Sequence, residues 1–406
     1  MKNMKLVQLF LASSLTLAMN AFAAETSTPA SPAASNNSQE LLIGTWTGGV
    51  PDGSGALKPV YNSRGIYKVR LNEDGTMLPL SEVKLDNPSW LAFSKNKQFI
   101  YATNEDNGDK EGRVSALKFT KSGDLTLINK VKSRGQQPTH AELSRDNKFL
   151  LISNYSSGPN HAGVTVFAIR ADGGVGKFVQ KIPFIKGSLA LPDRQTYGHA
   201  HSTAFSPDGE IAFMADLGSD VIRAYRYSPS AKVPLVAAPE LDLQFPKGSG
   251  PRHLVFSKDG SYLYATTEMG AQVIVFKRGE GENYSIVQQE NLTEDAEEDA
   301  KGGAGLIFSP DQKFLYVGNR RKTNEIVAYA VDATTGKLNL VGRYPSGGTE
   351  PRAFDIDASG QYLVVANVFS NTVSQFKRDI TTGELKPTQI ALQIGLPTDV
   401  KFLPKK

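Results

Sequence analysis

The chain alternates between short apolar segments and polar turns, and one such unit recurs six times. Each copy has an apolar segment, a tight turn containing Asp, Asn or Gly, and a second segment that is alternating or fully apolar. The copies occupy residues 88–105, 138–155, 200–217, 251–268, 303–320 and 351–368. The equivalent positions Phe93, Leu143, Phe205, Phe256, Phe308 and Ile356 are separated by 50, 62, 51, 52 and 48 residues. Short apolar runs bounded by turn residues predict a series of β-hairpins.

Two further strand patterns follow each hairpin. After the first copy, for example, RVSALKF (113–119) precedes LTLINKV (125–131), and Asp-Gly or Thr-Thr-Gly turns join such pairs elsewhere in the chain. Four antiparallel strands in a period of about 50 residues are typical of one blade of a β-propeller. The sequence therefore predicts an all-β propeller with at least six blades.

The two ends of this repeat region supply the strands of a seventh blade. PTDVKFL (397–403) matches a first strand that has no second strand after it, and ELLIGTWTG (40–48) matches a second strand that has no first strand before it. Pairing the N- and C-terminal strands would close the ring and remove an open sheet edge. We predict one seven-bladed domain over residues 40–406; a six-bladed ring with a separate terminal hairpin is the alternative. A closed ring requires no partner subunit, so we expect a monomer.

The N-terminus has the organisation of a secretory signal. Lys2 and Lys5 precede an apolar run from Leu6 to Met19, and Ala21-Phe22-Ala23 follows it. We expect residues 1–23 to be a signal peptide and 24–39, which are rich in Ala, Ser, Thr and Pro, to be a flexible leader. An uncleaved anchor is the alternative. The expected location is periplasmic or secreted, with no membrane attachment after cleavage.

The amino-acid composition and the missing motifs exclude several kinds of catalytic and metal-binding site. The 406 residues include no cysteine, which excludes disulfides, thiol nucleophiles and Cys–Zn sites and suits an oxidising compartment. The net charge of +4, which becomes +2 without the two signal lysines, gives no reason to expect nucleic acid or membrane binding. The G-x-S-x-G, Gly-rich phosphate-loop and H-E-x-x-H motifs are missing from the sequence. We therefore expect neither a cofactor nor a metal.

Unusual residues gather where first strands begin and second strands end, which is one mouth of a propeller's channel. Copies of a purely structural repeat would carry similar residues there, yet these copies carry His, Arg and Glu, and four of the five histidines lie at or just before this mouth. The longer connections 183–199, 47–64 and 291–302 also emerge at this face. The candidates are His201, Glu268, Arg252 and Arg320 for catalysis and His140, His199, His253 and Arg352 for substrate binding.

Each candidate also has a purely structural interpretation. Arg252 and Arg352 follow Pro and could bridge neighbouring blades, Glu268 and Arg320 could form a structural ion pair, and His140 and His253 could be satisfied polar residues beneath the mouth. A third set, Asn104, Asn154, Asp216, Asn319 and Asn367, recurs at one position of the repeat. Such repetition favours a turn cap over a metal site.

The catalytic candidates together fit ester hydrolysis. Glu268 or His201 can act as the base that a water nucleophile requires. Arg252 and Arg320 can stabilise the oxyanion that forms at an ester carbonyl, and a pair of arginines also suits a carboxylate or phosphate on the substrate.

The sequence resembles the bacterial propeller-type lactonase family. The segments that carry the resemblance are NPSWLAFS, QPTHAELS, YGHAHSTAFSPDG, DLGSDVIRAY, GPRHLVFSKDG, FSPDQKFLYVGNR and EPRAFDIDASGQYLVVAN, spread over nearly all of residues 40–406. That family includes the propeller form of 6-phosphogluconolactonase and the fungal carboxy-muconate lactonising enzymes. The resemblance implies a seven-bladed propeller and an active site made of His201, Arg252, Glu268 and Arg320.

These observations favour an exported lactonase that hydrolyses a sugar-acid lactone. A phosphorylated lactone would be met inside the cell, so the substrate of an exported enzyme could instead be an unphosphorylated aldonolactone or another carboxylated lactone. The alternatives are a non-catalytic periplasmic propeller that binds an anionic ligand or a protein, and a lactonase that depends on a divalent metal.

Overall fold

The structure is a computed structural model that describes residues 38–48, 63–106, 111–156, 162–295 and 297–404. The compact unit that contains them spans Ser35–Lys406. The predicted signal peptide, nearly all of the predicted leader and most of the 47–64 connection lie outside the described residues. No helix within the described ranges is long and apolar enough to cross a membrane.

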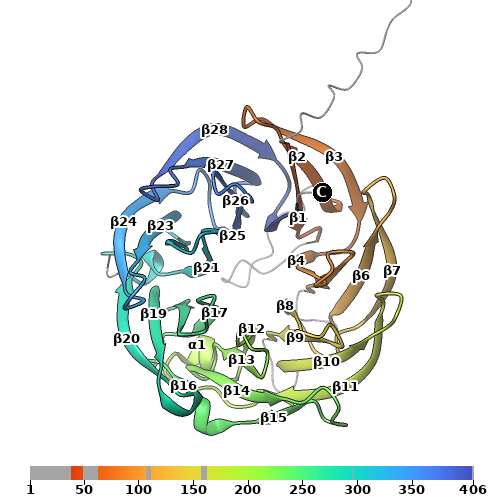
Figure 1. Cartoon of the computed structure of the whole chain (residues 1–406), viewed down its shortest axis with the longest axis vertical. Helices are drawn as coiled ribbons and strands as arrows, with labels where there is room; N and C mark the ends of the chain where they lie inside the picture. Colours follow the sequence, from red (N-terminus) through yellow and green to blue (C-terminus); the bar gives the residue numbers. More distant parts are fainter. Residues whose placement is uncertain (1–37, 49–62, 107–110, 157–161, 296, 405–406) are drawn as a thin grey trace, which may run out of the picture. The chain divides into compact units, whose positions relative to one another are not determined.

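Seven antiparallel sheets of the described chain are arranged as blades in a ring about a common centre, as Figure 1 shows. Blade 1 consists of β29 (Pro397–Phe402), β1 (Gln39–Thr45), β2 (Gly65–Leu71) and β3 (Met77–Lys84). Blade 2 consists of β4 (Pro88–Phe93), β5 (Phe99–Asn104), β6 (Arg113–Phe119) and β7 (Leu125–Lys132). Blade 3 consists of β8 (Pro138–Leu143), β9 (Phe149–Asn154), β10 (Gly163–Ile169) and β11 (Val175–Pro183).

The remaining blades follow in chain order. Blade 4 consists of β12 (Ala200–Phe205), β13 (Ile211–Asp216), β14 (Val221–Tyr227), β15 (Leu235–Ala237) and β16 (Leu243–Gln244). Blade 5 consists of β17 (Pro251–Phe256), β18 (Tyr262–Thr267), β19 (Gln272–Arg278) and β20 (Tyr284–Asn291). Blade 6 consists of β21 (Gly303–Phe308), β22 (Phe314–Asn319), β23 (Glu325–Val331) and β24 (Leu338–Pro345). Blade 7 consists of β25 (Pro351–Ile356), β26 (Tyr362–Asn367), β27 (Thr372–Arg378) and β28 (Leu385–Gln393).

The ring closes as the sequence predicts. The C-terminal strand β29 pairs with β1 in antiparallel register, with Leu41 opposite Phe402 and Ile43 opposite Val400. Blade 1 therefore has the strand order β29-β1-β2-β3. The chain ends thus complete a sheet, and the seven-bladed prediction is confirmed over the six-bladed alternative.

Apolar side chains pack between blades, and buried tyrosines add polar links between them. A tyrosine on the second strand of one blade donates a hydrogen bond to a glycine carbonyl in the outer hairpin of the next blade. The pairs are Tyr101 with Gly173, Tyr264 with Gly336 and Tyr316 with Gly383, at 2.9, 2.7 and 2.8 Å. Each of these glycines has a positive φ, which favours glycine in a hairpin turn. The link satisfies the tyrosine hydroxyl inside an apolar interface.

The repeated Asn and Asp side chains hold the chain where second strands end. Asn104 donates to the carbonyl of Asp86, Asn319 donates to the carbonyl of Ala300, and Asp216 accepts from the N–H of His199. These partners are backbone groups of the connection that leads into the same blade. The prediction that the recurring residues act as caps is confirmed at these three positions and at Asn367, which donates to the carbonyl of Ser346, whereas Asn154 donates to the carbonyls of Ile152 and Gly163 in its own blade.

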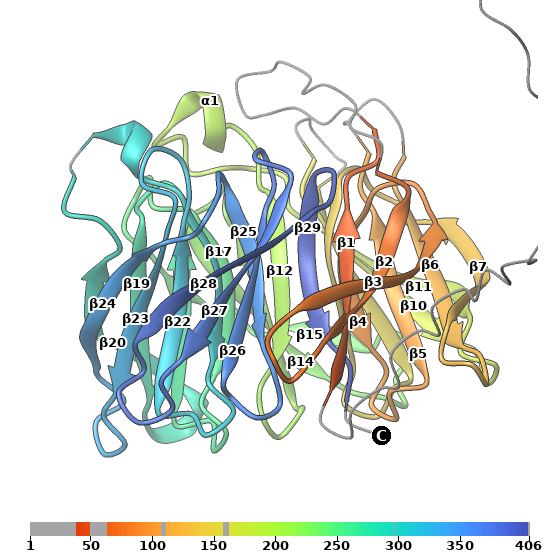
Figure 2. The ribbon, with the colours of Figure 1, turned by 90° about the horizontal axis from the view of Figure 1, so that it is seen from above.

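The first strands begin, and the second strands end, at one face of the ring. In Figure 2 a short helix, α1 (Pro192–Gln195), lies at this face beyond the strand ends. The described part of the chain also contains the short 3-10 helices η1 (Pro239–Leu241), η2 (Glu280–Glu282) and η3 (Glu298–Ala300). The 183–199 connection reaches this mouth, as the sequence predicts, and brings α1 to the site described next.

Candidate active site

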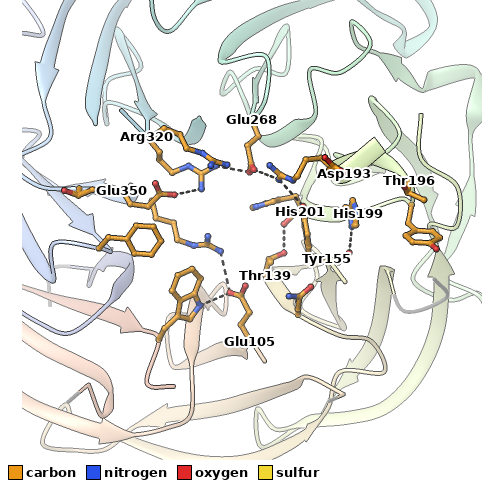
Figure 3. Close-up of a pocket in the computed structure, with 18 of the residues that line it drawn as sticks. Glu105, Thr139, Tyr155, Asp193, Thr196, His199, His201, Glu268, Arg320 and Glu350 are labelled. Carbon is orange, nitrogen blue, oxygen red and sulfur yellow. Dashed lines mark hydrogen bonds and ion pairs between the residues drawn. The ribbon is translucent and has the colours of Figure 1, made fainter. Parts of the chain in front are cut away.

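A pocket of about 860 Å³ opens at this mouth of the channel (Figure 3). Its walls combine charged side chains with aromatic rings and come from several blades and from the α1 connection. The lining residues that matter for its chemistry are Trp46, Glu105, Thr139, Tyr155, Arg194, His199, His201, Glu268, Arg320, Glu350 and Arg352. This convergence of charged groups from separate blades is the asymmetry that the repeat comparison predicts.

Glu268 lies at the centre of the charge network, immediately after β18. Its carboxylate is nearly buried, with 6% of the residue exposed, and it contacts three arginines. Oε2 accepts from Nε of Arg252 at 3.0 Å and lies 3.0 Å from Nη2 of Arg320, while Oε1 lies 2.6 Å from Nη2 of Arg194. The backbone N–H of Glu268 donates to the carbonyl of Gly250 at 2.7 Å, which fixes the start of the side chain.

The arginines keep this carboxylate ionised. Burial by itself would raise the pKa of Glu268, but the positive charges of Arg320, Arg194 and Arg252 outweigh burial and hold the pKa well below its ordinary value. One carboxylate facing three guanidinium groups leaves an excess of positive charge on this side of the pocket. Such a site can attract an anionic group or stabilise a developing oxyanion.

Both arginines that the sequence predicts for catalysis are almost completely buried. Arg252, the second residue of β17, is 1% exposed, and Arg320, which follows β22, is 5% exposed. Arg320 also contacts Glu350 at 2.8 Å and donates to the carbonyls of Gly302 and Gly303. Nη1 of Arg252 has no hydrogen-bond partner among the described residues. Arg252 therefore keeps an unused donor beside the carboxylate.

A second charged group faces Glu268 across the pocket. Nη2 of Arg352 lies 3.5 Å from Oε2 of Glu105, and the indole N–H of Trp46 donates to the same oxygen at 3.0 Å. The Arg352 guanidinium also covers the Trp46 ring at 4.7 Å from its centroid. These contacts hold Arg352 in the pocket wall, where the sequence predicts it.

Two of the four predicted histidines line the pocket. His199 stacks on Tyr155 with ring centroids 4.4 Å apart, and its Nδ1 lies 3.0 Å from the carbonyl of Tyr155. Burial, followed by the charge of nearby Arg252, lowers the pKa of His201 well below its ordinary value, so its imidazole is neutral at pH 7. Nδ1 of His201 is buried and has no partner in the part of the chain that the structure describes.

The other two histidines lie deeper in the channel. His253 packs against His201 with centroids 5.0 Å apart, and His140 packs against His253 and Trp90 at 5.8 and 4.4 Å. Neither is in the pocket wall. Burial lowers the pKa of His140 to about 3, which makes it a neutral packing group. Their predicted contact with substrate stays a prediction, and their location favours support of His201.

Arg194 and Glu350 contribute to the charge network, although the sequence comparison between repeats does not single them out. Arg194 is in α1 and Glu350 immediately precedes β25, so both belong to connections rather than to the repeated hairpins. The signal that points to Arg194 is indirect: it lies in the unusually long 183–199 connection, which the sequence predicts at this mouth.

The donor set of the pocket is suited to anions rather than to metal cations. Within the described ranges, no group of three or more His, Asp or Glu side chains is arranged to hold a metal ion. The carboxylates of Glu268, Glu105 and Glu350 face guanidinium groups instead. The arrangement offers an ionised carboxylate, a neutral imidazole and oriented positive donors at one mouth.

Comparisons with known proteins agree with this geometry. Residues 40–402 match the family model described as lactonase, 7-bladed beta-propeller. The 6-phosphogluconolactonase of Formosa agariphila is 34% identical over 326 residues, which are 79% of this chain and 90% of that protein. The 6-phosphogluconolactonase of Bacillus subtilis is 30% identical over 84% of this chain and 95% of its own length.

A solved structure of a lactonase is also similar to this chain over most of its length. The periplasmic gluconolactonase of Pseudomonas aeruginosa is 35% identical and superposes with a TM-score of 0.83, covering 91% of this chain and all of that one. The family model, the curated relatives and this structure each cover most of the propeller. The chain therefore belongs to the seven-bladed β-propeller lactonase family.

Proposed function

We propose that this protein is an exported lactonase that opens a sugar-acid lactone by attack of water. The observation that carries the proposal is the Glu268 carboxylate, which is held against Arg252 and Arg320 in a pocket that also contains His201. Relatives named 6-phosphogluconolactonase and gluconolactonase support a lactone ring as the reacting group.

In the proposed reaction, Glu268 accepts a proton from water while the water oxygen bonds to the lactone carbonyl carbon. The carbonyl oxygen becomes an oxyanion, which Arg252 and Arg320 stabilise by positive charge and hydrogen bonds. The bond between this carbon and the ring oxygen then breaks, and the ring oxygen takes the proton. His201 is neutral, with one donor and one acceptor nitrogen, so it can share this proton transfer. The product is the open hydroxy acid.

The polar wall of the pocket suits the sugar part of such a substrate. Thr139, Tyr155 and His199 line it beside the charged groups and offer hydroxyl and imidazole partners. We infer that these residues and Arg352 bind the hydroxyl groups of the substrate. The N-terminal signal pattern and the similarity to a periplasmic gluconolactonase support a location outside the cytoplasm.

The test is pH-stat hydrolysis by the purified mature protein. The panel contains gluconolactone, 6-phosphogluconolactone and a carboxylated muconolactone, each with and without EDTA. We expect saturable hydrolysis of at least one lactone, well above the rate in buffer and insensitive to EDTA. In parallel, isothermal titration with gluconate and 6-phosphogluconate measures binding. Affinity without turnover of any lactone would replace the enzyme with a binding propeller, and loss of turnover with EDTA would indicate a metal-dependent lactonase.

A further inference from the structure

We propose that Arg194 determines substrate specificity by binding an anionic substituent of the lactone, and that this exchange releases Oε1 of Glu268 to act as the base. The substituent is a phosphate or carboxylate attached away from the lactone carbonyl. The inference rests on the proposed function, because it assigns roles within the same pocket. It starts from the observation that Glu268 has both carboxylate oxygens occupied by arginines.

Occupied oxygens are a difficulty for a general base. A base must present an oxygen to the attacking water at hydrogen-bond distance. Oε2 is shared by Arg252 and Arg320, and Oε1 is 2.6 Å from Arg194, so the arginines take three of the roughly four acceptor positions of the carboxylate, and a water on Oε1 would lie beside the Arg194 guanidinium. If one of the three arginines changes partner, Glu268 gains a further acceptor position for water and becomes a stronger base.

Arg194 is the arginine that can change partner most easily. Its side chain is 32% exposed, whereas those of Arg252 and Arg320 are 1% and 6% exposed. Arg320 is also tied to Glu350 and to two backbone carbonyls. Besides its ion pair with Glu268, the Arg194 guanidinium donates a hydrogen bond to the hydroxyl of Tyr155, at 3.2 Å.

The backbone that carries Arg194 is fixed, so the exchange requires only the side chain to move. The neighbouring Gln195 is fully buried, and its amide donates to the carbonyl of Leu217 at 2.9 Å and to Oδ1 of Asp220 at 2.7 Å. The main chain of Gln195 also bonds to Leu191 and Leu189. An arginine on a rigid backbone with an exposed head can bind an incoming anion without any movement of α1.

The charge balance favours an anion at this position. The groups that face Glu268 are Arg194, Arg252, Arg320 and His201; Glu350 lies behind Arg320 and Tyr155 lies behind Arg194, while Asp193 also lines the pocket. With His201 neutral, the arginines at this mouth exceed the carboxylates by one charge: Arg194, Arg252, Arg320, Arg321 and Arg352 against Glu105, Asp193, Glu268 and Glu350. A phosphate or carboxylate on the substrate would balance this excess and would form a charge-assisted pair with the guanidinium.

The exchange also changes the chemistry of Glu268. When the substrate anion takes Arg194 Nη2, Oε1 loses its partner and can accept a hydrogen bond from water. Because one stabilising positive charge is now shared with the substrate, the carboxylate becomes a stronger base. A lactone without an anionic group leaves Arg194 on Glu268 and reacts more slowly.

The experiment compares Arg194→Met with Arg321→Met on two lactones. Arg321 also lines the pocket, but no ion pair between it and Glu268 is found among the described residues, so its variant removes the same charge as a matched control. For 6-phosphogluconolactone we expect Arg194→Met to lose about 10- to 100-fold in kcat/KM, the range for one charge-assisted contact. For uncharged gluconolactone we expect a loss below about threefold, or a gain, because Oε1 is already released. A glucarolactone carrying a carboxylate separates phosphate recognition from general anion recognition.

A pH profile separates this role from a structural one. Removing Arg194 should move the acidic limb of kcat/KM for gluconolactone to higher pH, while Arg321→Met should leave it in place. Equal losses on charged and uncharged lactones with an unmoved acidic limb would overturn the inference.

A titration keeps failure of the inference distinct from failure of the proposed function. Inorganic phosphate is titrated into the wild type, Arg194→Met and Arg321→Met. Loss of phosphate affinity by tenfold or more in Arg194→Met alone supports the anion site even if no lactone is hydrolysed. If the wild type hydrolyses lactones but both variants bind phosphate as it does, the function stands and the role of Arg194 is wrong.

Discussion

Replacement of Glu268 by Gln tests how much the ion pairs around this carboxylate contribute to the stability of the fold in the absence of substrate. The substitution keeps the volume of the side chain and one acceptor oxygen, so it creates no cavity. It removes the negative charge that three guanidinium groups share at 2.6, 3.0 and 3.0 Å. It also places an amide donor against guanidinium donors. Arg252 and Arg320, both nearly buried, lose a counter-ion that water cannot easily replace.

The size of the effect follows from burial. Breaking a buried ion pair by removing one partner costs about 3–5 kcal/mol in the free energy of unfolding. Arg320 keeps Glu350, and Arg194 is partly exposed, so we expect about 3 kcal/mol, the low end of that range. At about 2 °C per kcal/mol, the value for larger domains, the Tm should fall by roughly 6 °C.

The assay is thermal unfolding in chloride and in phosphate at equal ionic strength. Phosphate can occupy the place of the missing carboxylate, and at 100 times its Kd it would return about 2.7 kcal/mol. The wild type, whose arginines already face Glu268, should gain less. Glu350→Gln is the matched control: it removes the same charge from the same pocket but leaves Glu268 on all three arginines. If Glu268→Gln unfolds at the wild-type temperature in chloride and gains no more from phosphate than Glu350→Gln does, the electrostatic reasoning is refuted.

Three further predictions concern the reaction and the ring. Arg252→Met should lower kcat/KM on the preferred lactone about 10²- to 10³-fold through loss of an oxyanion donor, and unchanged initial rates would remove that role. Because the pKa of Glu268 is lower in the folded state than in the unfolded chain, its stabilisation is fully present above about pH 4.3 and is lost as the pH falls through the folded pKa. Acid titration of unfolding should therefore show a steeper loss below pH 4.3 for the wild type than for Glu268→Gln, and parallel curves would contradict this. Deletion of residues 397–406 removes β29 and exposes the edge of β1, so it should abolish soluble folded protein; a soluble deletion with a wild-type circular dichroism spectrum would contradict the closure.

The fold could be predicted from the sequence because the pattern that specifies each blade lies within a short segment and is repeated along the chain. Each hairpin carries its own alternation and turn, as at Gly209 and Gly260, and six copies make the pattern unambiguous. The split blade could also be predicted, since β29 and β1 are each incomplete without the other. Glu268 and Arg320 could be placed at one mouth because they occupy equivalent positions in adjacent repeats.

Two features could not be predicted from the repeats. They are how deep the histidine side chains lie in the channel and which arginines contact Glu268. A register shift near the start of the first strand, between Pro138 and His140 and between Pro251 and Leu254, changes how deep a side chain lies in the channel. An alignment of repeats does not reveal such bulges. Arg194 reaches Glu268 from a connection that occurs once, and its path depends on long-range bonds such as those of Gln195.

The most direct test of the proposed activity is a comparison of kcat/KM for wild type, Glu268→Gln and Glu350→Gln on the best lactone of the panel. The two variants change one carboxylate to an amide in the same pocket, but only Glu268 contacts both Arg252 and Arg320. We expect Glu268→Gln to lose about 10²-fold or more and Glu350→Gln to lose much less, since general-base catalysis contributes about 10²- to 10⁴-fold. Wild-type turnover in Glu268→Gln, with its folding verified, would contradict the assignment of Glu268 as the base.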